Sequence, residues 1–147
     1  MKDERKAFNL HHPTSHIFLR EIDLRLLAIA AGGATGALLR YAVSGLAYTI
    51  FGENFPWGTL SVNLIGCLLI GFLWQTFENS ALSPQLRALI FVGGLGAFTT
   101  FSTYGLESVN LLRDGQVRVA LLNVLGSNLL GLVAVFLGML LARIGNS

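Results

Sequence analysis

The side chains that could do chemistry in this chain are mostly uncharged, and they are densest between residues 93 and 104. This segment carries three glycines and four Ser or Thr hydroxyls within a long apolar stretch. Glycine costs about 1 kcal/mol relative to alanine inside a helix, and hydroxyl side chains compete for backbone hydrogen bonds. A helix through this segment is therefore expected to break near its middle, and the freed carbonyl groups could bind a small cation. A kinked but inert helix is the alternative.

Amide and hydroxyl groups also recur at helical spacing in two other stretches. Thr59, Asn63 and Gly66 share one helix face. A second stripe consists of Asn123, Ser127 and Gly131, with Asn128 beside it. An amide offers two N–H donors and a hydroxyl offers one. Each stripe could line a polar pathway or join helices through hydrogen bonds, and the sequence leaves both interpretations open.

Groups suited to covalent catalysis are sparse. All three histidines, His11, His12 and His16, precede the first apolar stretch, so a Ser–His pair cannot form within the apolar region. They could bind a metal, but no further ligands follow at a fixed spacing, which favours a disordered tail. The single cysteine, Cys67, excludes an intrachain disulfide. We do not expect an enzyme.

The elements that must position these groups are membrane helices. Apolar residues make up 53% of the 147 residues, charged residues only 12%, and the mean hydropathy is +0.64. A soluble domain carries about 25% charged residues. Crossing the hydrocarbon layer takes about 20 apolar residues in a helix. Four stretches reach that length, at residues 26–50, 58–77, 88–112 and 119–141. The expected fold class is an all-α integral membrane protein whose third helix is broken at mid-membrane.

Polar tails, residues 1–25 and 142–147, flank this four-span domain, and an even number of spans places both on one side. Basic residues near the span ends differ only weakly between the two sides; four (Arg20, Arg25, Arg87 and Arg143) lie on the side of the termini and two (Arg113 and Arg118) on the other. Lys2, Arg5 and Lys6 in the first tail could add to the side of the termini and would favour termini inside. Such a weak bias permits insertion in either orientation. The basic residues are scattered rather than clustered, which argues against nucleic-acid binding.

Arg40 is the only charged residue in the first span and lies toward its far end. Its side chain could extend to the membrane interface, or it could line a vestibule that attracts anions.

The motifs of three spans resemble the Fluc (CrcB) family of fluoride channels. The matching segments are residues 33–41, 57–66 and 93–103, which include the strings GTLSVNLIG and GAFTTFST. The resemblance covers all four spans. It implies a fluoride-selective channel of the cell (inner) membrane that exports fluoride from the cytoplasm by passive conduction and so lowers its toxicity.

The same resemblance implies an antiparallel, dual-topology homodimer with two anion pores and a central structural sodium ion. It implies pore roles for Asn63, Phe101, Tyr104, Thr103, Ser127 and Arg40. The backbone carbonyls of Gly96 and Thr99 match the sodium-binding positions. The family usually has a second phenylalanine where this chain has Tyr104, and a second serine at or near Gly131. The polar track could therefore be shorter here, or could include Asn123 or Asn128.

The chemistry of these residues suits fluoride, which is small and strongly hydrated. Amide and hydroxyl donors can replace its water, and the positive edge of an aromatic ring can face an anion. One rival function is a proton-coupled exporter of organic cations, which needs a carboxylate within the membrane. Glu107 is the only candidate for that role. The other rival is a non-transporting assembly protein, and fluoride efflux from liposomes would separate all three.

Overall fold

Four long helices make up the part of the chain that the computed structural model describes, residues 13–78 and 80–145. Each is long and apolar enough to cross a membrane, and the spanning segments are Arg20–Phe51, Trp57–Phe77, Pro84–Arg113 and Val117–Gly145. Each contains one of the four apolar stretches identified in the sequence. The prediction of an all-helical, four-span chain is confirmed.

The first helix, α1 (Pro13–Phe51), begins well before the first apolar stretch. Proline is favoured in the first turn of a helix, and no glycine follows before Gly32 to interrupt the elongation. Gln85 also donates a 2.9 Å hydrogen bond to Glu21, which lies in the part of α1 that precedes the first apolar stretch. The expected disordered tail is therefore wrong from Pro13 onward, and His16 lies in the helix. His11 and His12 lie outside the described residues.

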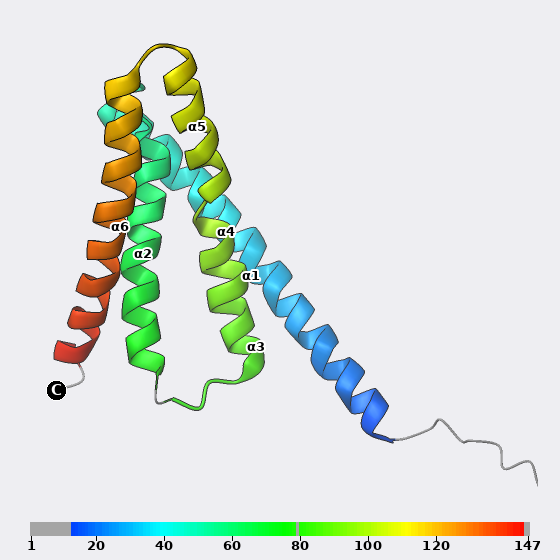
Figure 1. The fold of residues 1–147 in the computed structure, drawn as a ribbon. Helices are drawn as coiled ribbons and strands as arrows, with labels where there is room; N and C mark the ends of the chain where they lie inside the picture. Colours follow the sequence, from blue (N-terminus) through cyan, green and yellow to red (C-terminus); the bar gives the residue numbers. More distant parts are fainter. Residues whose placement is uncertain (1–12, 79, 146–147) are drawn as a thin grey trace, which may run out of the picture.

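The helices α2 (Trp57–Phe77) and α6 (Val117–Gly145) pack closely side by side along their length (Figure 1). Glycines allow this approach. A Cβ atom added at Gly71 would collide with the backbone carbonyl of Val135, and one added at Gly138 would collide with that of Leu68. Backbones can meet this closely only where a side chain is absent.

The third span is made of several pieces. The short helix α3 (Pro84–Arg87) leads into a π-helical segment, η1 (Ala88–Leu95), and then into α4 (Gly96–Phe98). Thr99 and Thr100 have extended backbone, with φ/ψ of −83°/159° and −149°/118°. The helix resumes as α5 (Phe101–Arg113).

The glycines of α1 receive the third span. A Cβ atom at Gly32 would collide with the carbonyl of Leu89, and one at Gly36 with the carbonyl of Gly94. The small residues that the sequence spaces four apart on α1 thus serve packing within the chain. They place η1 and α4 against the middle of α1.

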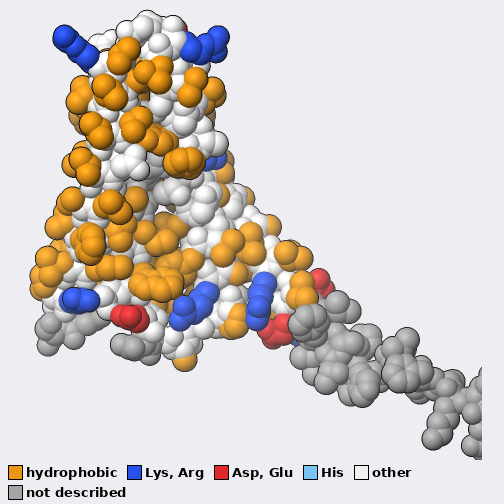
Figure 2. Space-filling model, in the orientation of Figure 1, with side chains coloured by type: hydrophobic (Ala, Val, Ile, Leu, Met, Phe, Trp, Pro, Cys, Tyr) orange, Lys and Arg blue, Asp and Glu red, His pale blue; other side chains and the backbone are white. Residues whose placement is uncertain are grey.

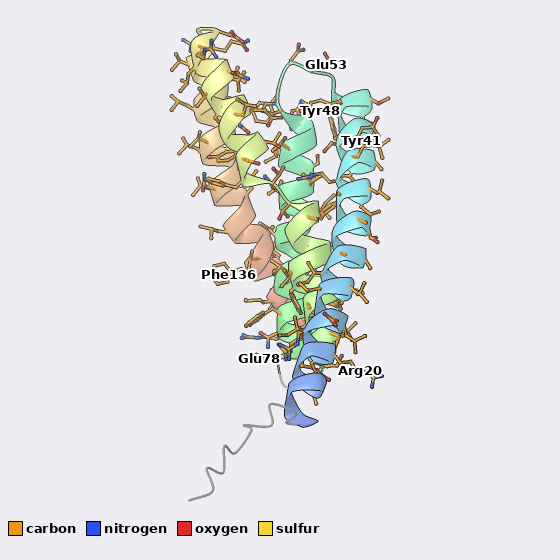
Figure 3. All side chains as sticks on the ribbon, turned by 90° about the vertical axis from the view of Figure 1, so that its right-hand side faces the viewer. Arg20, Tyr41, Tyr48, Glu53, Glu78 and Phe136 are labelled. Carbon is orange, nitrogen blue, oxygen red and sulfur yellow. The ribbon has the colours of Figure 1, made fainter. Side chains whose placement is uncertain are left out.

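The surface is predominantly apolar between the two ends of the molecule. In Figure 2 hydrophobic side chains cover this middle region, and most of the Lys and Arg side chains in view lie toward the ends. Arg20 and Glu78 lie at one end and Glu53 at the other (Figure 3). The described start of α1 and the end of α6 lie at the same end (Figure 1). This distribution is that of a multi-pass membrane protein.

Candidate functional site

A groove of about 340 Å³ lies between α2, the interrupted third span and α6. Its walls include most of the residues singled out in the sequence, namely Asn63, Gly96, Thr99, Phe101, Tyr104 and Ser127. The remaining lining is largely apolar and includes Cys67, Ile70 and Leu95. The fold therefore gathers amides, aromatic rings and several hydroxyls from three spans into one mostly apolar groove.

Asn63 on α2 pairs with the backbone at the interruption of the third span. Its Nδ2 donates to the carbonyl of Thr100 at 3.1 Å, and its Oδ1 accepts from the amide of Thr100 at 2.9 Å. These two bonds satisfy backbone groups that no helix satisfies there. They also fix the orientation of the amide, because the Thr100 N–H can only donate and the carbonyl can only accept. One N–H of Asn63 remains for the groove.

The carbonyls of Gly96 and Thr99 lose the amide donors that a continuous helix would give them. In an α-helix these donors would be the N–H groups of Thr100 and Thr103. Here the Thr100 N–H donates to Asn63, and the Thr103 N–H donates to Oγ1 of Thr100 at 3.2 Å. The hydroxyl of Thr99 donates to the carbonyl of Leu95 at 3.0 Å. Any ligand that Thr99 supplies would therefore be its backbone oxygen.

Two aromatic rings follow the interruption at the start of α5. The ring centroids of Phe101 and Tyr104 are 5.4 Å apart, and the rings are tilted by 48°. Phe101 is 82% exposed in the single chain. An aromatic ring carries partial positive charge at its edge, so the edges of these rings can face an anion favourably.

Asparagines on α6 hold the polar side of the groove. The phenol oxygen of Tyr104 accepts a 3.0 Å hydrogen bond from Nδ2 of Asn128. Asn123 is fully buried and donates to Ser108 at 2.9 Å, and Ser108 in turn donates to the carbonyl of Tyr104. Ser127 donates to Oδ1 of Asn123 at 3.3 Å. Most hydrogen-bond donors on this side of the groove therefore connect α5 with α6.

Thr103 and Arg40 do not line this groove. Thr103 is exposed in the first turn of α5, where its Oγ1 accepts from Thr100 at 3.0 Å. Arg40 is half-buried on α1, immediately before Tyr41, which Figure 3 labels.

A second hollow, of about 410 Å³, is lined in part by Glu53 and Glu107. Glu53 lies at the end of the molecule opposite Arg20 (Figure 3). Oε1 of Glu107 accepts hydrogen bonds from Thr59 at 2.8 Å and from Tyr48 at 3.3 Å. Oε2 is buried and has no hydrogen-bond partner among the described residues. Thr59 shares a helix face with Asn63, so one face of α2 bonds both Glu107 and the interrupted backbone at Thr100.

Comparison with known proteins identifies the family. The model of the family described as CrcB-like protein, Camphor Resistance (CrcB), matches residues 27–139. The chain belongs to the CrcB-like family. It is 55% identical over 115 residues to a fluoride-specific ion channel FluC of Salinibacter ruber, covering 78% of this chain and 86% of the relative. It is 47% identical over 122 residues to the FluC of Magnetococcus marinus, covering 82% and 99%.

The CrcB-like match spans the groove and both segments that meet at Thr100. Sequence reasoning named most of the groove but missed Thr100 as the partner of Asn63, and it left Asn128 only as an alternative. The GTLSVNLIG and GAFTTFST strings place these groups on two spans, but they do not indicate which atoms pair.

Proposed function

We propose that this chain is a fluoride-selective channel that exports fluoride passively from the cytoplasm across the cell (inner) membrane. The observation that carries the proposal is a mostly apolar groove in which Asn63 keeps one N–H donor beside two aromatic rings. The relatives of this CrcB-like chain are named fluoride-specific ion channels, which supports the choice of ion. The proposed activity is conduction and includes no covalent step.

Fluoride requires replacement of its water on entering such a groove. Hydrogen bonds to a charged group contribute about 1.5–3 kcal/mol each, so a few donors fixed around a small ion offset part of its dehydration. Ring edges add weak positive charge without the bulk of another ligand. A larger anion would fit the same donors poorly, which favours fluoride over chloride.

An antiparallel homodimer would complete the pore. Phe101, 82% exposed, would face the lipid in a single chain although it lies beside polar groups of the groove. A second, inverted copy of this chain would cover that side. The weak bias of the basic residues between the two ends permits the dual topology that such a dimer needs.

A sodium ion at the interruption of the third span would play a structural part. The carbonyls of Gly96 and Thr99, whose helical donors are engaged elsewhere, fit a small monovalent cation. Uncharged carbonyls offset too little of the dehydration of a divalent ion. When bound, sodium supplies positive charge where the low dielectric makes it effective. The interruption would then lie at mid-membrane.

Arg40 and Thr103 would act outside the groove. An arginine in an aqueous vestibule would raise the local concentration of anions, and an exposed hydroxyl on α5 would extend the polar path.

Efflux from liposomes tests this function. Purified protein should release fluoride and retain chloride, and the release should be faster than from protein-free liposomes. Equal release of the two halides would contradict selectivity, and no fluoride release would contradict the channel. No fluoride release, together with proton-driven transport of an organic cation, would favour the rival exporter, in which Glu107 would carry the proton.

A further inference from the structure

We propose that the phenolic O–H of Tyr104 donates a hydrogen bond to the anion in the groove, and that Asn128 is the residue that positions it. This inference rests on the proposed channel function and deepens it. It gives a role to the one ring hydroxyl among the groove residues.

The direction of the bond between Asn128 and Tyr104 follows from a third atom. Nδ2 of Asn128 lies 2.7 Å from the backbone carbonyl of Val124 and 3.0 Å from the phenol oxygen of Tyr104. A carbonyl can only accept, so the atom facing it must be the amide nitrogen and not the amide oxygen. Each of the two amide hydrogens then has its own acceptor. The phenol oxygen accepts one of them, and its own hydrogen is left to donate.

Most other donors that line the groove are already engaged. The hydroxyl of Ser127 donates to Asn123, that of Thr99 to Leu95, and that of Thr100 to Thr103. Asn128 uses both amide hydrogens, and Asn63 uses one. Among the side-chain nitrogen and oxygen groups of the described residues that line the groove, two donors therefore remain. They are one N–H of Asn63 and the O–H of Tyr104.

The position of Tyr104 makes this donor useful to an ion. Its ring lies 5.4 Å from that of Phe101, centroid to centroid, and both line the groove with Asn63. A phenol whose oxygen accepts a hydrogen bond is a stronger donor through its own hydrogen, because the two bonds polarise each other. Asn128 therefore both aims the hydroxyl and strengthens it. A tie between α5 and α6 with no part in ion binding is the competing interpretation.

The test measures the fluoride concentration that gives half-maximal efflux from proteoliposomes. Tyr104→Phe removes only the hydroxyl and should raise that concentration about tenfold, the lower end of the contribution of a hydrogen bond to a charged group. Asn128→Ala should raise it in the wild-type background but change it little when Tyr104→Phe is already present. Tyr41→Phe is the matched control, because Tyr41 is 83% exposed on α1 and does not line the groove.

Each outcome has a distinct meaning. Wild-type protein that releases no fluoride would overturn the proposed function itself. Wild-type release combined with an unchanged half-maximal concentration in Tyr104→Phe would overturn this inference and leave the channel function standing. Equal effects of Asn128→Ala in both backgrounds would show that Asn128 acts only as a tie between helices. If Tyr104→Phe does not fold, Asn128→Ala decides alone, and an unchanged concentration overturns the inference.

Discussion

Asn63 divides its amide between the protein backbone and the groove. Two of its hydrogen bonds hold Thr100, and the remaining N–H is free to contact an ion. A substitution there therefore changes both the ion path and the support of the interrupted helix. A substitution that keeps only one of these two functions can separate ion contact from support of the helix.

Asn63→Asp should abolish fluoride efflux. The carboxylate can still accept from the Thr100 amide, but it cannot donate to the Thr100 carbonyl, and its negative charge repels fluoride. We expect the rate to fall to that of protein-free liposomes while the protein still elutes as a folded species. Asn54→Asp makes the same change at an exposed loop residue and should retain the wild-type rate. Wild-type efflux from Asn63→Asp would contradict the role of Asn63.

At the scale of the element, the interrupted third span depends on its backbone more than on its hydroxyls. Thr99→Ala removes a hydroxyl that bonds Leu95, so it should weaken sodium dependence only slightly. Gly96→Val should weaken it strongly, because a branched side chain beside the carbonyl restricts the backbone. Gly96→Ala is the control, since its Cβ would meet only the Phe91 carbonyl, at 3.6 Å.

Fluoride efflux and thermal stability, measured in sodium and in a large organic cation, check this prediction. If exchanging the cation changes neither quantity in the wild type, the third span holds no sodium ion.

The contact of α2 with α6 makes a separate prediction about stability. Gly71→Ala would place a methyl group against the Val135 carbonyl and should destabilise the protein by about 1–3 kcal/mol. Gly126→Ala lies on α6 with no atom within 4 Å of the added Cβ, so it should leave the melting temperature equal or higher. Melting curves of the two variants in detergent would compare them, and a lower temperature for Gly126→Ala alone would contradict this account.

Length and hydropathy predicted the four spans because the cost of exposing polar backbone to lipid leaves few alternatives. The composition of residues 93–104 likewise predicted weak helix there. The pairing of Asn63 with Thr100 could not be predicted, since the two residues are far apart in the sequence and are joined only by packing. The early start of α1 was missed because polar residues without a breaker favour neither helix nor tail strongly.

At the scale of the whole molecule, the weak bias of the basic residues between the two ends permits insertion in either orientation, as the proposed antiparallel dimer requires. After Cys67→Ser, a cysteine introduced as Ser80→Cys lies in the loop that follows α2, at the end of the molecule where α6 also ends (Figure 1). We expect a membrane-impermeant thiol reagent to label it from both sides of the membrane in comparable amounts. Asn54→Cys, in the loop at the opposite end, should behave alike. Labelling of each position from one side only would contradict dual topology.

The two bonds between Asn63 and Thr100 also bear on the order in which the protein can be made. Until Asn63 is beside it, Thr100 would enter lipid with an unsatisfied amide and carbonyl, at a cost of several kcal/mol. The ribosome delivers α2 before the third span, so this partner is already in the membrane when Thr100 arrives. Because of this order, Thr100 can form its hydrogen bonds with Asn63 as soon as the third span enters the membrane. A circular permutant in which α2 is synthesised last would leave the Thr100 amide and carbonyl unpaired until the end of synthesis.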